Sequence, residues 1–161
     1  MHPNMKALLD TLGFSEGTST SRATKNNGYD VIVTGADGKP EVFTDYSTHP
    51  FSRGRAPKVI NSKGLRSTAS GRYQHLVRDW DHYRKLLKLV DFGPASQDAW
   101  ALQLIKERGA VALIEAGRFA EAITKISNIW ASLPGANYAN QPMHPMDKLQ
   151  AYYLSVGGKL A

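Results

Sequence analysis

The sequence predicts an α+β fold with a mostly helical body, a small β-hairpin lobe inserted after the first helix, and a cleft between lobe and body. Apolar residues recur at helical spacing near the start, two β-branched segments flank a turn at residues 30–45, and helical patterns fill the chain from residue 70 onward. With 161 residues, 42% of them hydrophobic, the chain has the size and composition of one globular domain. We therefore predict a single domain over residues 1–161.

The first helix is predicted from Met5, Leu8, Leu9 and Leu12, and Gly13 follows as a stop signal. Residues 15–27 are rich in Ser, Thr and Gly and are expected to form a loop.

The β-hairpin is predicted from residues 30–34 and 41–45, which surround the dense turn signals of residues 35–40. It is the only β element that the pattern supports. Residues 47–70 contain Pro and Gly breakers and many basic residues, so we expect a long loop, and loops of this length are often functional.

From Ser70 onward the pattern predicts helices separated by short breaks. The first apolar stripe contains Tyr73, Leu76, Val77, Trp80, Tyr83 and Leu87. Gly93-Pro94 ends it, and Ser96 is a candidate cap for the next helix. Further stripes run over 119–126 and 146–156. Trp80 and Trp100 are assigned to the core.

Composition narrows the possible functions without choosing one. The net charge is +6, from 20 Lys and Arg against 14 Asp and Glu, which favours acidic partners such as nucleic acid, anionic lipid or the bacterial wall. There is no cysteine, so neither a disulfide framework nor a thiolate site is expected. The N-terminus lacks the pattern of a secretory signal, and no apolar run approaches the ~18 residues of a membrane span.

Glu16 is the candidate catalytic group, because it comes where the first apolar helix ends and a Gly-bearing loop begins. Desolvation in such a place raises the pKa of a carboxyl group and suits it to general acid catalysis. Most glutamates at helix ends are simply solvated, and sequence alone does not show burial.

A second carboxylate, which glycosidic hydrolysis usually requires, is not singled out. Asp30, Glu41 and Asp45 lie at the ends of the predicted hairpin, where Asp is also common as a turn residue. The choice stays open, and so does a mechanism with a single carboxyl group in which a hydroxyl of the sugar attacks intramolecularly.

Sugar-binding candidates come from a turn and from aromatic residues. The turn is Ser70-Gly71-Arg72-Tyr73-Gln74, in which the amide of Gln74 offers a donor and an acceptor for sugar groups. The aromatic candidates, whose rings pack on pyranose faces, are Tyr46, Tyr73, Trp130 and Tyr138. Tyr73 and Trp130 also lie where core packing would place them.

Other chemistries find no support in the sequence. The five histidines show no zinc-ligand spacing, although His75 and His82 could share a helix face. No P-loop, dinucleotide-binding glycine motif or nucleophile elbow is present. The basic residues between Arg53 and Arg72 lack the interleaved aromatic residues of single-strand binders, so we expect a solvated loop that contacts an acidic polymer.

Several segments together resemble the endolysins of lambda-like phages, the lambda lysozyme family. The matching segments are Ser15-Glu16-Gly17-Thr18, Asn27-Gly28-Tyr29-Asp30-Val31-Ile32-Val33, Phe43-Thr44-Asp45-Tyr46-Ser47 with His49-Pro50, Gly71-Arg72-Tyr73-Gln74, Ser96-Gln97-Asp98, Ile105-Lys106-Glu107-Arg108-Gly109-Ala110 and, most specific of all, Ser127-Asn128-Ile129-Trp130-Ala131-Ser132-Leu133-Pro134-Gly135-Ala136. The similarity runs from the first helix to about Tyr138.

This resemblance implies a lysozyme-like fold and a lytic transglycosylase. Such an enzyme cleaves the β-1,4 bond between N-acetylmuramic acid and N-acetylglucosamine and leaves a 1,6-anhydro-muramic end. The single catalytic glutamate of the family maps onto Glu16. The residues expected in the sugar cleft are Tyr46, Ser47, Tyr73, Gln74, Asn128 and Tyr138.

The resemblance also implies a monomer without metal or cofactor, with peptidoglycan strands as partner. Such a protein accumulates in the host cytoplasm and reaches the wall through membrane holes made by a holin. The chain departs from the family pattern at Asn27, in the hairpin turn, between Phe51 and Lys58, and in the tail after Tyr138, which includes Pro142-Met143-His144-Pro145. Three alternatives remain: a hydrolytic muramidase that uses Glu16 together with an Asp, a non-catalytic wall-binding module, and a nucleic-acid-binding domain.

Overall fold

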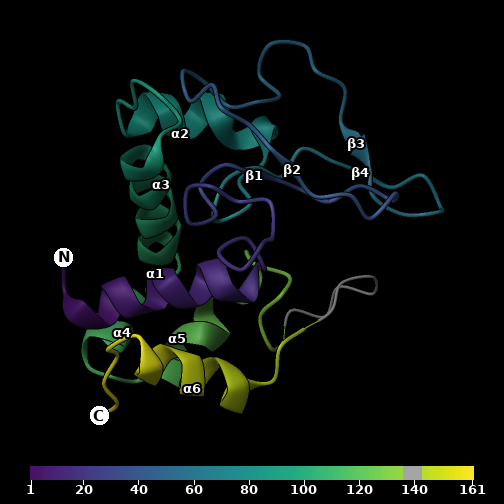
Figure 1. Cartoon of the computed structure of the whole chain (residues 1–161). Coiled ribbons are helices and arrows are strands. Elements are labelled where there is room, and N and C mark those ends of the chain that lie inside the picture. The colour runs from purple at the N-terminus through teal and green to yellow at the C-terminus, as the bar shows by residue number, and fades with distance from the viewer. Residues whose placement is uncertain (136–142) are drawn as a thin grey trace. The chain divides into compact units, whose positions relative to one another are not determined.

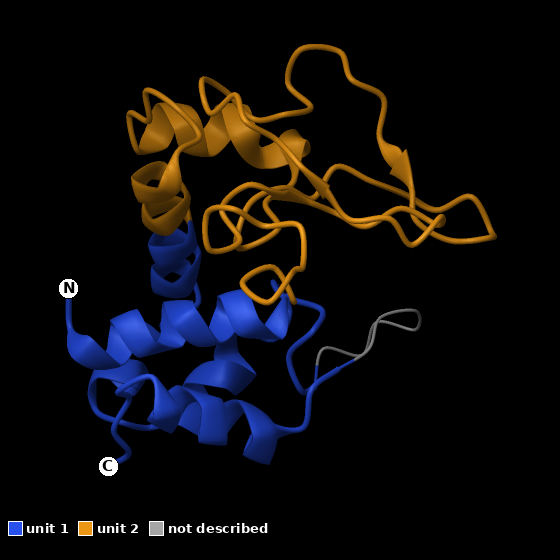
Figure 2. Ribbon diagram, viewed as in Figure 1, with its two compact units in different colours: residues 1–16, 101–161 blue, residues 17–100 orange. Residues whose placement is uncertain are grey.

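The computed structural model describes residues 1–135 and 143–161 and divides the chain into two compact units. One unit comprises residues 1–16 and 101–161, and the other comprises residues 17–100 (Figure 2). The boundary falls within helix α3 (Pro94–Glu107). The α+β character is confirmed, since helices and small antiparallel sheets follow one another along the chain (Figure 1). The single-domain assignment for 1–161 stays a prediction.

Helix α1 (Pro3–Ser15) delivers Glu16 to its C-terminal end, as predicted. It begins at a proline behind the cap residue His2, whose Nδ1 accepts the backbone N–H of Asn4 at 3.1 Å. Gly13 does not stop the helix, because the turn that contains it is buried and continues to Ser15. The backbone N–H of Glu16 donates to the carbonyl of Leu12 at 2.9 Å and completes the last turn.

The remaining helices of this unit supply the apolar surface that α1 needs. They are α4 (Val111–Glu115), α5 (Phe119–Ile126) and α6 (Met146–Ser155). The predicted apolar stripe over 119–126 is confirmed, since Phe119, Ala122, Ile123 and Ile126 are all buried. The ring of Tyr153 on α6 stacks on Phe119 with centroids 4.5 Å apart. None of the helices that the structure describes is long and apolar enough to cross a membrane.

The predicted hairpin is present in the other unit, where β1 (Val31–Ile32) pairs antiparallel with β2 (Glu41–Val42). The expectation that it is the only β element is wrong. A second antiparallel pair, β3 (Lys58–Val59) with β4 (Arg66–Ser67), lies in the segment assigned to a long loop. Its turn is closed by Asn61, whose side chain accepts two backbone N–H groups, and by Gly64 at φ +80°.

The expectation of a helix from Ser70 onward is also wrong. Residues 70–76 form a tight turn, and helical structure begins with the 3₁₀ turn η1 (Val77–Asp79) and α2 (Trp80–Leu86). His75 therefore precedes the helix and cannot share a helix face with His82. Ser96 lies inside α3, where its hydroxyl donates to Asp91, so it is not the cap residue.

Aromatic stacking forms the core of the 17–100 unit. Trp80 and Trp100 are buried, as predicted, and the ring of His75 stacks on Trp100 with centroids 4.0 Å apart. His49 donates from Nε2 to the carbonyl of His75 at 2.8 Å. Burial lowers the pKa of His49 to about 4 and that of His75 to about 3. Both rings are therefore neutral near pH 7 and serve as core residues.

Gln97 fixes the 70–76 turn at the point where Gly71 has φ +81°. Its Oε1 accepts the backbone N–H of Arg72 at 2.9 Å, and its Nε2 donates to the carbonyls of Tyr29 and Phe92. A Cβ on residue 71 would lie 2.2 Å from Oε1 of Gln97. Only glycine fits between this backbone and the buried amide.

We therefore predict that Gly71→Ala destabilises the protein far more than Gly64→Ala. Both positions have positive φ, which costs an alanine about 1–2 kcal/mol, but residue 64 has open space around it. Displacing the amide of Gln97 adds about 1–3 kcal/mol at residue 71. Denaturant unfolding of the two variants measures the difference. Equal losses would show that the contact with Gln97 is unimportant.

Candidate functional site

The side chain of Glu16, which is partly exposed, forms a polar pair with the buried Ser132. The hydroxyl of Ser132 donates to Oε1 of Glu16 at 2.9 Å, across 116 positions of sequence. Burial raises the pKa of the carboxyl group to about 7, although the hydrogen bond from Ser132 acts in the opposite direction. The two effects together leave a glutamate that exchanges a proton near neutral pH.

Ser132 belongs to the candidate site through its contact with Glu16, although no sequence pattern predicted it. It belongs to the turn after α5, in which the N–H of Leu133 bonds the carbonyl of Trp130 at 3.0 Å. The hydroxyls of Ser15 and Ser132 lie 2.8 Å apart. The side chains of Ser15, Ser132 and Glu16 therefore form a continuous chain of hydrogen bonds. The motif that contains Ser132 marked the family, but no local pattern pairs it with Glu16.

The candidate second carboxylates are committed to structural contacts in the 17–100 unit. Asp30 is buried and accepts the hydroxyl of Thr24 and the backbone N–H of Lys25. Glu41 is paired with Arg55 at 2.6 Å and with Lys58 at 3.0 Å, and the Arg55 contact is the main reason why its pKa falls to about 2.

Asp45 is an exposed turn carboxylate. It accepts the backbone N–H of Ser47 at 2.9 Å and forms an open ion pair with Arg53 at 3.5 Å. The hydrogen bonds of Ser47 lower the pKa of Asp45, so this group is ionised and solvated at neutral pH.

Tyr46 and Ser47, both predicted to bind sugar, follow β2 in this unit. The phenol oxygen of Tyr46 accepts the amide of Asn26 at 2.9 Å, and its ring is 5.0 Å from that of Phe43. Ser47 accepts a guanidinium N–H of Arg53 at 3.3 Å. Both side chains thus present hydrogen-bonding groups that already have polar neighbours.

Tyr73 and Gln74 lie in the turn that Gln97 holds. The ring of Tyr73 is only 1% exposed, and its hydroxyl donates to Asp98 at 2.6 Å. Gln74 has φ +53°, and its amide donates to the carbonyl of Gly71 at 3.0 Å. Tyr73 therefore packs beneath the turn, while Gln74 is the partly accessible member of the pair.

Asn128 belongs to the other unit, where it is exposed and its Oδ1 accepts Nε of Arg108 at 3.2 Å. Trp130, two positions on, is 2% exposed, so the core alternative holds for its ring. Tyr138 lies outside the described residues.

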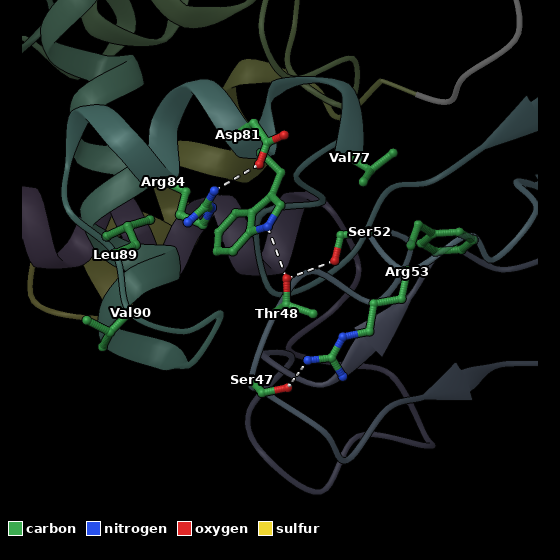
Figure 3. A pocket seen from close by; sticks show the side chains of 11 residues that line it. Ser47, Thr48, Ser52, Arg53, Val77, Asp81, Arg84, Leu89 and Val90 are labelled. Atoms are coloured by element: carbon green, nitrogen blue, oxygen red, sulfur yellow. Dashed lines mark hydrogen bonds and ion pairs between the residues drawn. The ribbon is translucent and has the colours of Figure 1, made fainter.

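A pocket of about 710 Å³ is formed by residues of the 17–100 unit, including Ser47 (Figure 3). Thr48 lies at its centre, where it accepts the indole N–H of Trp80 at 3.1 Å and contacts Ser52 at 2.8 Å. Figure 3 shows two guanidinium groups at its sides, those of Arg53 and Arg84. Because Arg84 pairs with Asp81 and Arg53 with Asp45, the pocket presents hydrogen-bonding groups more than free charge.

The basic segment does not behave as one solvated loop. Arg72 is 3% exposed, and its guanidinium lies 5.2 Å from the centre of the Tyr29 ring. Arg55 and Lys58 are occupied with Glu41. In the parts of the chain that the structure describes, no three His, Asp or Glu side chains are placed to hold a metal ion.

Comparisons with known proteins agree on one family. A family model described as Endolysin matches residues 6–160. The endolysin of Escherichia phage P2 is 59% identical over 157 residues, covering 98% of this chain and 94% of the relative. The endolysin of Escherichia phage lambda is 54% identical over 154 residues, covering 95% of this chain and 90% of the relative.

Solved structures agree as well. The lysozyme of bacteriophage lambda, in complex with a chitohexasaccharide, matches with a TM-score of 0.89 and 52% identity, covering all of this chain and 98% of that one. A second structure of the same lysozyme matches with a TM-score of 0.85. The predicted lysozyme-like fold class is thereby confirmed.

We predict that Ser132→Ala raises the pKa of Glu16 above its value of about 7. The substitution removes the hydrogen bond that stabilises the carboxylate and leaves burial, which disfavours charge, unopposed. A ¹³C NMR titration of the Glu16 carboxyl group measures the shift, with the exposed Ser155→Ala as control. An unchanged or lower pKa would contradict the role assigned to this contact.

Proposed function

The chain belongs to the endolysin family, whose members are lysozyme-like enzymes that degrade bacterial peptidoglycan, and we propose that it does so as a lytic transglycosylase with Glu16 as its catalytic acid and base. The observation that carries this proposal is the carboxyl group at the end of α1, whose desolvation raises its pKa to about 7.

The proposed reaction has two proton transfers through one group. Neutral Glu16 gives its proton to the glycosidic oxygen as the bond from C1 of N-acetylmuramic acid to that oxygen breaks, so N-acetylglucosamine leaves with a new hydroxyl. The Glu16 carboxylate then takes the proton of the muramic 6-hydroxyl while O6 bonds to C1. The product is a 1,6-anhydro ring, no water is consumed, and the enzyme regains its proton.

A pKa near neutrality suits both halves of this cycle. A carboxyl group with a much lower pKa would already be ionised before the first transfer. A group with a much higher pKa would be too weak an acid to donate its proton. The hydroxyl of Ser132 contacts Oε1, which leaves Oε2 as the oxygen that carries the transferred proton. The contacts that occupy Asp30, Glu41 and Asp45 favour a mechanism without a second carboxylate.

The substrate proposal is peptidoglycan glycan strands, bound in part by Tyr46, Ser47, Gln74, Asn128 and Tyr138, with Tyr73 supporting the turn. The lambda lysozyme structure, which holds a chitohexasaccharide, supports a glycan ligand for this chain. A net charge of +6 also favours approach to an anionic wall. We further propose that the enzyme acts as a monomer, without metal or cofactor, after release from the host cytoplasm by a holin.

The test is mass spectrometry of muropeptides released from purified sacculi by the wild type and by Glu16→Gln. We expect anhydro products lighter by one water, and a loss of rate of at least about a hundredfold in the variant because proton transfer is lost. Glu115→Gln, an isosteric change at an exposed glutamate of the same unit, should keep the wild-type rate.

The alternatives predict other products. Reducing muramic ends would establish a hydrolytic muramidase, with Asp30 the first residue to examine. Binding without release would establish a wall-binding module. A folded Glu16→Gln protein with the wild-type rate would refute the assignment of Glu16.

The pH dependence follows from the same carboxyl group. Its pKa of about 7 means that the protonated form predominates below that pH and is lost above it. We therefore expect kcat/KM to fall above about pH 7 and to approach a tenfold loss per pH unit, as for a single required proton. Initial rates on sacculi at constant ionic strength measure this limb. Activity that rises steadily from pH 7 to pH 9 would mean that Glu16 does not act as the acid.

A further inference from the structure

His144 makes two backbone contacts that lie on either side of the Glu16–Ser132 pair. Its backbone N–H donates to the carbonyl of Ser132 at 2.9 Å. Its ring Nε2 lies 3.0 Å from the carbonyl oxygen of Ser15. Since a carbonyl only accepts, Nε2 carries a hydrogen and donates to it. One residue thus connects the segment that supplies the hydroxyl with the segment that supplies the carboxyl group.

The bond to Ser15 acts on the peptide unit that leads directly into Glu16. The N–H edge of that unit is held by the carbonyl of Leu12 at 2.9 Å, and its C=O edge is held by His144 at 3.0 Å. Because both its N–H and its C=O are hydrogen-bonded, this peptide plane cannot rotate in either direction without breaking a hydrogen bond. The backbone from which the Glu16 side chain extends is therefore fixed.

The bond to Ser132 fixes the other partner of the pair. The hydroxyl of Ser132 has one hydrogen and donates it to Glu16, so it accepts from the hydroxyl of Ser15 at 2.8 Å. When Glu16 is protonated on Oε2, its Oε1 remains an acceptor, so both hydroxyls can keep their direction. The arrangement serves either charge state only while the backbones of Ser15 and Ser132 keep their separation.

The ring of His144 is seated by apolar contacts of the same unit. Its centroid is 5.7 Å from that of Phe14, which stacks on Tyr152 of α6 at 4.1 Å. The ammonium group of Lys148 on α6 lies 5.8 Å from the centre of the Phe14 ring. Packing therefore orients the imidazole toward the carbonyl of Ser15.

From these contacts we propose that His144 is a positioning residue, which holds the backbones of Ser15 and Ser132 so that the Ser132 hydroxyl stays on the carboxyl group of Glu16. The inference deepens the proposed function, on which it rests. It assigns no contact with substrate to His144, whose effect passes through the two serines.

The test compares His144→Phe with His144→Gln. Phenylalanine keeps a ring against Phe14 but has no donor, whereas the Gln amide nitrogen can take the place of Nε2. We expect His144→Phe to raise the Glu16 pKa in a ¹³C NMR titration, in the direction of Ser132→Ala, and to lower kcat on sacculi by about tenfold or more through misplacement. His144→Gln should restore both quantities toward the wild type.

A double-mutant cycle with Ser132→Ala separates positioning from general stability. If His144 acts through Ser132, adding His144→Phe to Ser132→Ala should leave the Glu16 pKa where Ser132→Ala alone puts it. The matched control is His2→Phe, which removes a histidine contact at the other end of α1 and should leave the pKa unchanged. If His144→Phe does not fold, His144→Asn replaces it, because its amide is too short to reach Ser15.

The outcomes distinguish this inference from the proposed function. An unchanged Glu16 pKa in folded His144→Phe, or additive shifts in the double variant, would overturn the positioning role. That result would leave the assignment of Glu16 intact, since the rate of Glu16→Gln decides it separately. A fully active Glu16→Gln enzyme would refute the catalytic assignment, whatever the titration of the His144 variants shows.

Discussion

The burial of one carboxyl group is the constraint on which the rest of this molecule depends. Partial desolvation raises the pKa of Glu16 to about 7 and disfavours an unsupported charge in that position. The site therefore needs a donor that is itself held in place, which Ser132 provides. It also needs α1 to end at a fixed point. At its start, the amide of Asn4 bonds the carbonyls of Ile114 and Lys159 and accepts the N–H of Lys159, so the helix is tied to the chain's last residues.

The 17–100 unit fixes its candidate sugar-binding turn, residues 70–76, in a different way. Little regular structure holds it, since each of its four strands has only two residues. Buried polar side chains take over that role. Gln97 bonds three separate backbone segments, and Asp98 accepts the hydroxyls of Tyr29 and Tyr73 at 2.8 and 2.6 Å. Fully satisfied networks of this kind fix irregular backbone where ladders of hydrogen bonds are absent. Gln74 is presented from a turn that these contacts define.

Sequence patterns predicted the elements that local chemistry determines. Helix α1, the stripe of α5 and the β1–β2 hairpin follow from apolar spacing and turn residues, and they were found close to their predicted places. The failures have physical causes. Of the apolar residues at helical spacing from Tyr73 to Leu87, only Tyr73 and Trp80 are buried. The hydrogen bonds of Gln97 and the left-handed Gly71 and Gln74 favour a turn before α2. The β3–β4 pair is short and polar, and the Asn61 turn that closes it lies in a segment dominated by breakers.

The candidate site likewise has one part that the sequence predicts and another that it does not. Glu16 could be predicted because its position at the end of an amphipathic helix is a local property. Its partners could not, because Ser132 and His144 are brought to it by packing of α1 against α6 and the turn after α5, and that packing has no local signature. The contacts of His144 also use backbone carbonyls, which every residue has, so no side-chain motif marks them. A single-carboxyl mechanism makes this support more important. In the proposed mechanism, one carboxyl group gives up a proton and recovers it without a second carboxylate. The hydroxyls beside that group would then have to keep their positions in both charge states.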